Sequence, residues 1–506
     1  MKTYGRKTIY VNFTEKELLS MDVEQQNQKI LEVLPQIVDI HEDNKTETQY
    51  LWDYLIGKQD IQYKEKYTRK EINNKTVENW CYAFVDFKKS WQLGKPIQYV
   101  MLNDSSNEEI SKLNQFVRYE GKKAKDLMLY EDVLVAGRGF RFTNFDDKGE
   151  EDEAPFSIIN VDNKFCEVIY SSKLGNEQVF SVLETPMETI MVNQETGVPS
   201  TLYYSNYTVY LRNRAIEIDG KSGYQIVGSK PIALNDHVIT EWYVNRGRIS
   251  LIEIGKDLFD DINYLESLDK DDMEQFVNAI MVFTNAEVDE EEFEAIKELG
   301  AVSIKSTENR KASVELLQAR LNAQDTQVYY TRLLTSLHQL LGIPMAGDAG
   351  SVTSGDTGKA KLTGQGFTSA GIRAESDETM ITMCDYKSLK KILKICKETA
   401  SSGISTLKVS DIDIKLQRDM SDNLLVKTQG LLNLLSADIP REYALPIVNL
   451  FSDSNAVVKM MQDKFGDQTS QLNAGSKEPD TVNIDDRAVN QENEIKNIIE
   501  NETQDN

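Results

Sequence analysis

The stretch Gly342-Ile-Pro-Met-Ala-Gly-Asp-Ala-Gly-Ser-Val-Thr-Ser-Gly-Asp356 separates two long helical patterns and decides how the chain is organised. Its first glycine and Pro344 are typical of the end of a helix. Its later glycines give the backbone conformations that other residues rarely reach. We therefore expect a mobile loop between two helices.

Upstream of this loop, the sequence predicts two long helices with a small insert between them. Helix 255–278 has an apolar face with Leu258, Ile262 and Leu265, and helix 308–341 takes its apolar periodicity from Ser313 onward. Most aspartates of the first helix are expected off its apolar face: Asp257, Asp260, Asp261, Asp269, Asp271 and Asp272. The insert, 279–307, predicts a strand at 280–283, an acidic helix at 290–299 and a strand at 301–304. So thin a projection buries little apolar surface alone, so we expect further copies of the chain beside it.

Downstream, one long helix is predicted over 357–397. Its first half is rich in glycine and alanine, which costs helix stability unless something packs closely there or the helix bends. Its second half is amphipathic, with Ile381, Cys384, Leu389, Ile392 and Ile395 inward and Lys387, Lys390, Lys391, Lys394 and Lys397 mostly outward. A strand at 412–417, short helices to about residue 460 and a polar, acidic, disordered tail complete the expectation.

The N-terminal half predicts a mixed body of helices and strands. Apolar spacing indicates helices within 18–34, 50–57, 77–91, 110–116 and 127–134. Short β-branched and aromatic runs between 140 and 243 predict an antiparallel sheet region, with the acidic stretch 146–153 at a hairpin tip. The predicted fold class is therefore α+β.

The composition excludes several classes of function. At 506 residues the chain is long enough for several domains, and its 40% hydrophobic and 27% charged residues are typical of globular proteins. Four cysteines without a C-x-x-C pair and only three histidines give little material for a metal site or a histidine triad. The net charge of −25 argues against tight binding of nucleic acid but permits a surface past which DNA slides. We expect neither a membrane span nor a secretory signal.

No stretch supports an enzyme. Residues 354–360 resemble the end of a phosphate-binding loop, but Thr353 stands where the motif needs glycine and Ala360 where it needs Ser or Thr. The carboxylates from Asp289 to Glu294 lie on one or two helical turns with no histidine near them, so a solvated face is the simpler interpretation. We expect no catalytic residues, no metal and no cofactor.

An ordered set of sequence landmarks resembles the portal (head-to-tail connector) proteins of tailed bacteriophages, in the branch typical of long-tailed phages of Gram-positive hosts. The landmarks cover most of residues 45–450 and are YLIGKQ at 54–59, NNK at 73–75, VDFKKSWQLGKPIQY at 85–99, VAGRGF at 135–140, VDNKFCEVIY at 161–170, YVNRGR at 243–248, LFDDINYLES at 258–267, MEQFVNAI at 273–280 and LGIP at 341–344.

The resemblance implies a homo-oligomeric ring, usually dodecameric, at one capsid vertex of the virion, assembled in the host cytoplasm. Double-stranded DNA would pass through its channel, and its partners would be the terminase large subunit, a head-completion or adaptor protein, and the major capsid and scaffolding proteins. The parts implied are a wing (1–254), a stem helix (255–278), a clip (279–307), a second stem helix (308–341), a tunnel loop (342–356), a long kinked helix with a return strand (357–420), a crown (421–466) and a disordered acidic tail (467–506).

Two sets of site residues follow from the resemblance. The tunnel loop and adjacent helix would face DNA through Gly347, Asp348, Gly350, Ser351, Thr353, Ser354, Asp356, Lys359 and Lys361. The clip would dock partners through Glu287, Asp289, Glu290, Glu291, Glu292 and Glu294. The alternatives are another phage structural ring without DNA transit and, third, an enzyme.

Overall fold

A computed structural model gives the fold of the chain. It describes residues 4–67, 70–102, 108–146, 153–192, 199–221, 223–277, 280–284, 313–317, 323–345, 367–416, 424–437 and 439–448, and the single residues Val457 and Met460. The chain divides into two compact units, Met1–Asp422 and Asn423–Asn506. The second unit contains α11 (Leu424–Ser436) and α12 (Arg441–Val448), which pack against each other.

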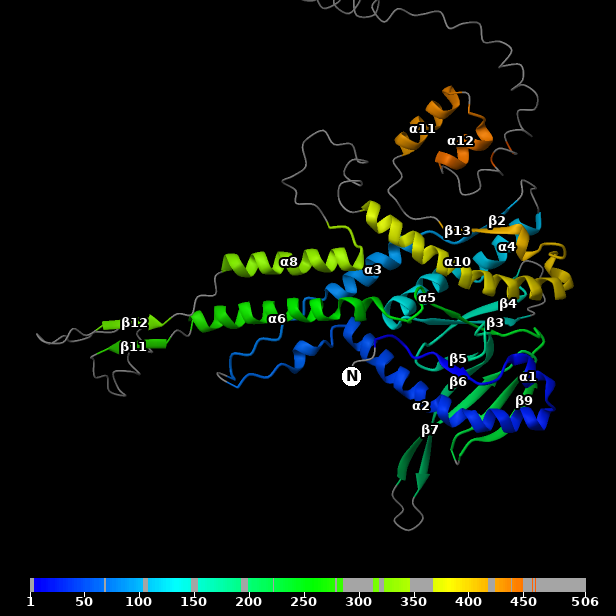
Figure 1. Cartoon of the computed structure of the whole chain (residues 1–506), viewed down its shortest axis with the longest axis horizontal. Helices are drawn as coiled ribbons and strands as arrows, with labels where there is room; N and C mark the ends of the chain where they lie inside the picture. Colours follow the sequence, from blue (N-terminus) through cyan, green and yellow to red (C-terminus); the bar gives the residue numbers. More distant parts are fainter. Residues whose placement is uncertain are drawn as a thin grey trace, which may run out of the picture. The chain divides into compact units, whose positions relative to one another are not determined.

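The first unit combines long helices with short 3-10 turns (Figure 1). Its described helices are α1 (Glu15–Ser20), α2 (Val23–Leu55), α3 (Trp80–Leu93), α4 (Glu108–Tyr119), α5 (Lys122–Ala136), α6 (Leu251–Val277), α8 (Ala323–Leu341) and α10 (Phe367–Glu398). The 3-10 turns are η1 (Asp60–Tyr63), η2 (Ala400–Ser402) and η3 (Val409–Asp411). Helices α6 and α8 lie side by side, with β11 and β12 beyond their far end.

Four sheets accompany these helices. Their strands are β1 (Ile9–Val11), β2 (Gln98–Met101), β3 (Gly139–Phe145), β4 (Phe156–Val161), β5 (Cys166–Ser171), β6 (Gln178–Val192), β7 (Pro199–Tyr210), β8 (Arg214–Asp219), β9 (Gln225–Pro231), β10 (Ile239–Trp242), β11 (Ile280–Thr284), β12 (Ser313–Leu317) and β13 (Ile412–Lys415). The strand orders are β1-β5-β6-β7-β8-β9, β10-β3-β4, β11-β12 and β13-β2. All pairs are antiparallel except β1 with β5. The α+β class and the antiparallel region over 140–243 are confirmed, whereas the pairings of β1 and β2 were not predicted.

The two N-terminal helical patterns form one helix, α2, and our separate helices within 18–34 and 50–57 were wrong in this respect. The buried face of α2 continues through His41, Asn44 and Thr48. Because these buried residues are polar, the apolar periodicity breaks while the helix does not. The first half of α2 packs on the six-stranded sheet and its last turns pack in the larger core.

The predicted start of the second long helix at Ser313 was also wrong. Residues Ser313–Leu317 form β12, which pairs antiparallel with β11, and the helix begins only at Ala323. A five-residue apolar run fits both a helical and an extended period, so Ser313 was misinterpreted as a helix cap. The strand at 280–283 is confirmed as β11. The predicted helix 290–299, strand 301–304 and tail 467–506 lie outside the described residues.

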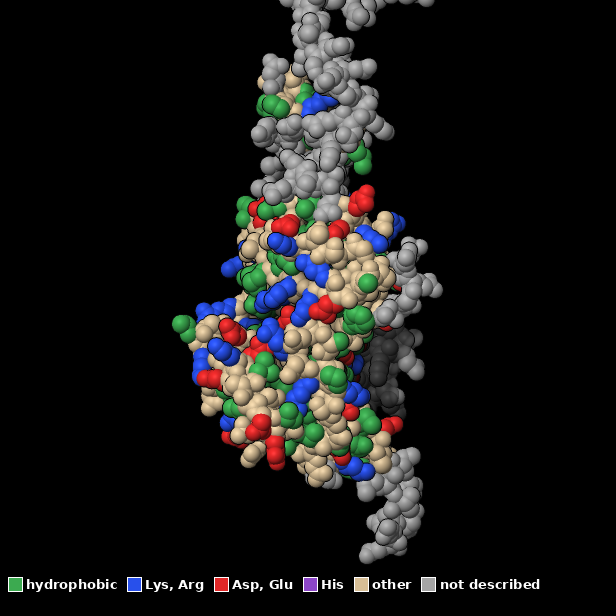
Figure 2. Space-filling model, turned by 90° about the vertical axis from the view of Figure 1, so that its right-hand side faces the viewer, with side chains coloured by type: hydrophobic (Ala, Val, Ile, Leu, Met, Phe, Trp, Pro, Cys, Tyr) green, Lys and Arg blue, Asp and Glu red, His purple; other side chains and the backbone are tan. Residues whose placement is uncertain are grey.

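Helix α10 confirms the inward residues of its amphipathic half and corrects one lysine. Ile381, Cys384, Leu389, Ile392 and Ile395 are buried, and Lys387, Lys390 and Lys397 are exposed. Lys391 is instead buried, and its Nζ donates to Thr240 Oγ1 on β10. Burial lowers the pKa of Lys391 to about 7. Lys and Arg side chains are scattered among Asp and Glu on the face at the right of Figure 1, which Figure 2 shows, so the acidic net charge is unevenly distributed.

Two left-handed glycines bound α5 and give a matched test of backbone packing. Gly137 (φ +79°) ends the helix, and a Cβ there would lie 1.9 Å from the carbonyl oxygen of Arg248. Gly121 (φ +65°) precedes the helix, and a Cβ there would meet no atom within 4 Å. We expect Gly121→Ala to cost about 1–2 kcal/mol from backbone strain alone. Gly137→Ala should cost more, because the Arg248 backbone must also move. Chemical denaturation of both variants measures this, and equal losses would contradict the packing.

Candidate functional site

All the site residues predicted from the sequence lie outside the described residues. This holds for the loop and helix positions Gly347, Asp348, Gly350, Ser351, Thr353, Ser354, Asp356, Lys359 and Lys361 and for the acidic positions Glu287, Asp289, Glu290, Glu291, Glu292 and Glu294. The structure does describe the elements on which both segments are mounted. Those elements are α8 and α10 for the loop, and α6 with the β11–β12 hairpin for the acidic insert.

The start of the predicted loop is tied to α10. Gly342 adopts a left-handed conformation (φ +66°) directly after α8, and a Cβ there would lie 2.2 Å from Cδ of Arg373. Arg373 Nη1 donates to the carbonyl oxygen of Leu340 at 2.6 Å, and the backbone N–H of Ile343 donates to the carbonyl oxygen of His338 at 3.0 Å. An arginine thus satisfies a carbonyl at the C-terminal end of α8, where helices leave such groups unpaired. Glycine is required because the guanidinium group occupies the space of its side chain.

The N-terminal half of α10 is held by polar contacts to α3 and α5. Ala370 and Ala374 are buried, and Gln92 Nε2 on α3 donates to the carbonyl oxygen of Ala374 at 3.2 Å. One turn later, the Tyr130 hydroxyl on α5 donates to Asp377 at 3.1 Å. The far end of the loop is therefore fixed to the body of the unit.

Helices α6 and α8 meet through a close contact at Gly255. A Cβ there would lie 3.1 Å from Leu337 Cδ1 and 3.3 Å from Leu341 Cδ1, both on α8. His338 on α8 packs edge-on against Phe84 at 4.8 Å between ring centroids. Burial lowers the pKa of His338, so its neutral form is favoured in this aromatic setting. The helix pair is thus anchored on α3 at its base.

An extended segment runs along α6 and forms a ladder of hydrogen bonds with it. We call residues 58–79, of which 68 and 69 are outside the described residues, the arm. Backbone N–H groups of Asn74, Thr76 and Glu78 donate to side chains of α6, at 2.6, 2.9 and 2.8 Å respectively. The acceptors are Asp271, Ser267 and Asn263, spaced one helical turn apart. Two extended residues span about 6.7 Å and four helical residues about 6.0 Å, so the two periods nearly match.

Asp271 is the strongest rung of this ladder, and our expectation that it lies off the buried face was wrong. Its carboxylate is fully buried and is 2.9 Å from Lys64 Nζ and 3.0 Å from Lys66 Nζ. Burial alone would raise its pKa, but the two lysines and Asn74 outweigh that effect and hold the pKa well below its usual range. The spacing of Asn263, Ser267 and Asp271 was visible in the sequence, but polar residues on a helix are normally solvated.

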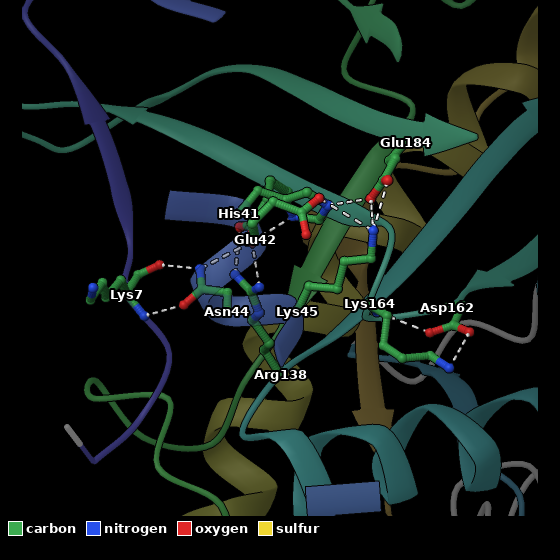
Figure 3. Close-up of polar contacts among 10 residues, drawn as sticks. Lys7, His41, Glu42, Asn44, Lys45, Arg138, Asp162, Lys164 and Glu184 are labelled. Carbon is green, nitrogen blue, oxygen red and sulfur yellow. Dashed lines mark hydrogen bonds and ion pairs between the residues drawn. The ribbon is translucent and has the colours of Figure 1, made fainter. Parts of the chain in front are cut away.

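A second polar cluster joins α2 to the sheets (Figure 3). His41 Nδ1 lies 3.2 Å from Glu167 and Nε2 lies 2.9 Å from Glu184. Arg138 forms a bidentate pair with Glu167 at 2.5 Å, and Lys45 Nζ lies 2.7 Å from Glu184. Burial lowers the pKa of His41, but the two glutamates outweigh it and raise the pKa to about 9. A charged imidazole with both nitrogens engaged cannot act as a general base, so the cluster is structural.

The described residues contain no group of three or more His, Cys, Asp or Glu that could hold a metal ion. All four cysteines are buried and free. Burial raises the pKa of the Cys81, Cys166, Cys384 and Cys396 thiols, which disfavours the reactive thiolate. In the same part of the chain, no helix is long and apolar enough to cross a membrane.

Comparison with known proteins assigns the class to which this arrangement belongs. Residues 34–470 match the family model described as "Phage portal protein, SPP1 Gp6-like", and the chain belongs to this family of phage structural proteins. A chain of the solved structure "Neck of empty GTA particle computed with C6 symmetry" is similar at 12% identity and a TM-score of 0.40, over 73% of this chain and 90% of that one. A comparison with curated proteins finds no match. The resemblance found in the sequence is thereby confirmed, while the Gram-positive branch stays a prediction.

Asp271→Asn tests whether the ladder holds the arm. The amide keeps the shape of the side chain but removes the charge that neutralises Lys64 and Lys66, leaving them buried without a counter-ion. We expect trypsin to cleave within the arm several-fold faster than in the native protein, measured by limited proteolysis and mass spectrometry. The control is Asp269→Asn on the same helix, which should cleave at the native rate. Unchanged cleavage in Asp271→Asn would contradict the role of this residue.

The His41 cluster predicts a pH-dependent contribution to stability. The folded pKa of about 9 lies above the ordinary value of 6.5, so protonation favours the folded state. The stabilisation is complete below about pH 6.5 and is lost as pH rises through 9. The difference in unfolding free energy between native protein and His41→Gln should shrink by about 3 kcal/mol over this window. Lys45→Gln, as a control, should show a nearly constant difference. A pH-independent difference for His41→Gln would contradict the assignment.

Proposed function

We propose that the chain forms a homo-oligomeric ring, usually of twelve copies, at one capsid vertex, through which double-stranded DNA is packaged and ejected. The match to the portal family over residues 34–470 carries this proposal. The ring would dock the terminase large subunit and a head-completion protein, and would contact the major capsid and scaffolding proteins during assembly in the host cytoplasm. The chain itself would catalyse no reaction.

The parts of the ring follow from the described elements. Helices α6 and α8 would form the stem, and the segment between them, which contains the β11–β12 hairpin, would form the clip. The body before α6 would be the wing, α10 with β13 would return to the wing, and α11 with α12 would belong to the crown. The tunnel loop would lie between α8 and α10. The contact of Arg373 with Leu340 and the contact of Gln92 with Ala374 support this assignment, because a loop that bears on DNA needs fixed ends.

The exposed side of α8 suits a surface past which DNA slides. It carries amide and hydroxyl side chains, including Gln327, Thr331 and Gln339, with Arg332 as its exposed basic residue. Such a surface makes few charge-assisted contacts to phosphate, and these contacts supply most of the affinity of DNA-binding proteins. Contacts would be weak and independent of base sequence, as transit of any sequence requires.

The acidic segment 287–294 would steer partner proteins toward the clip. Eight consecutive residues there include Glu287, Asp289, Glu290, Glu291, Glu292 and Glu294. Complementary charge raises the rate of encounter and fixes orientation more than it raises affinity. A second candidate function is a phage ring without DNA transit, which the same helix pair and hairpin would permit.

Substitution of Gly350 and Gly355 by proline separates the two candidates. Proline removes the backbone freedom that a moving loop needs but leaves α8, α10 and their contacts intact. We expect Gly350→Pro/Gly355→Pro protein to assemble as rings in electron micrographs, while nuclease-protected DNA per particle falls severalfold. Gly355→Ala is the control and should package nearly as well as native protein. Full packaging with the proline variant would contradict a moving loop, and packaging without the protein would overturn the function.

A further inference from the structure

Helix α6 is covered by its own chain on some sides and is bare on another. Its contacts with α8 lie around Gly255 and Phe259, and its contacts with the arm lie along Asn263, Ser267 and Asp271. The remaining side has exposed or half-buried residues at helical spacing, and we call it the bare side: Ile254, Asp257, Leu258, Asp261, Tyr264, Leu265, Leu268 and Asp272.

The bare side combines apolar surface with unpaired negative charge. Ile254 is 47% exposed and Tyr264 is 50% exposed, which is more than a solvated helix of a lone chain needs. Asp257 and Asp261 have no ion-pair partner among the described residues. Partial burial, together with Asp257 and Asp260, raises the pKa of Asp261, so its charge is disfavoured in a single copy. Cations supplied from outside would relieve this repulsion.

The outward surface of the arm has the complementary chemistry. Tyr63 is 76% exposed and Tyr67 is 92% exposed, so two aromatic rings lie in solvent. Lys70 and Lys75 are also exposed, and neither pairs with a carboxylate among the described residues; Lys75 Nζ donates only to the carbonyl oxygen of Gln62, at 2.8 Å. Aromatic and cationic groups on the arm thus match apolar and anionic groups on the bare side.

The two surfaces belong to different sides of the same helix pair. In a closed ring each copy meets its two neighbours through two different surfaces, repeated around the ring. A pair of complementary surfaces at the same level along α6 meets this requirement, because the arm binds α6 beside Asn263 and Asp271 while the bare side spans residues 254–272.

We propose that the arm of one copy packs on the bare side of α6 in the next copy, with Lys70 and Lys75 facing Asp257 and Asp261. The inference rests on the proposed ring but names a contact that the ring alone does not specify. The arm would then hold two helices at once, its own α6 through the backbone ladder and the neighbouring α6 through its side chains.

Charge reversal tests this contact. The arm variant is Lys70→Glu/Lys75→Glu, and the helix variant is Asp257→Lys/Asp261→Lys. Each alone places like charges across every contact, so we expect ring formation at low salt to weaken at least about tenfold. Mass photometry and native mass spectrometry measure the ring population. The control Glu24→Lys/Asp39→Lys, at two exposed positions of α2, should form rings like native protein.

A mixture of the two assembly-deficient variants gives the decisive result. Each arm would then meet a helix of opposite charge on the other variant, so rings should return with the two chains alternating in equal numbers. Recovery only when all four changes are in one chain, without recovery in the mixture, would place the contact within a copy and overturn the inference. Normal rings from either variant alone would overturn it too.

A cysteine pair gives a second readout that does not depend on charge. Lys70→Cys/Asp261→Cys protein should form disulfide-linked chains of several copies under mild oxidation, because its native thiols are buried. Monomers alone on a denaturing gel would count against the contact. Native protein that forms no ring would refute the proposed function itself, whereas native rings with indifferent variants refute only the contact.

Discussion

The first unit depends on the match in length between an extended chain and a helix. Asn74, Thr76 and Glu78 present a backbone N–H at every second residue, and α6 presents an acceptor at every fourth. Both repeats are between about 6 and 7 Å, so a strand-like segment binds a helix through side chains without entering a sheet. Without this ladder, α6 would project from the body with only α8 beside it. The carboxylate of Asp271 closes the ladder by also neutralising Lys64 and Lys66.

Family membership gives this construction its context. A portal subunit needs a rigid helix pair, a segment at the end of the pair for partners, and a loop whose ends do not move. The contacts of Gly255 with Leu337 and Leu341 and of Arg373 with Leu340 fit the first and last needs. The buried His41 cluster keeps α2 attached to the sheets on which the rest is mounted. The chemistry is thus mechanical, and polar groups serve to fix positions.

The sequence predicted elements well where apolar periodicity was long. Helices α3, α5 and α6, the sheet region and β13 follow the expected pattern, because each buries one regular apolar face. It failed where buried faces are polar. His41, Asn44 and Thr48 hid the continuity of α2, and Asp271 and Lys391 were expected to be solvated although each has a partner from a distant segment. The five residues of β12 were too short for their period to distinguish a strand from a helix. No local pattern indicates which distant segment will supply such a partner.

The central claim is that α6, braced by the arm, runs along the channel of a ring and meets the next copy there. A single-particle reconstruction of the assembled protein tests it most directly. The account predicts α6 and α8 parallel to an axial hole wide enough for a DNA duplex, with residues 70–75 of each copy against residues 257–261 of its neighbour. A reconstruction without a hole, or with α6 pointing radially away from it, would contradict the account.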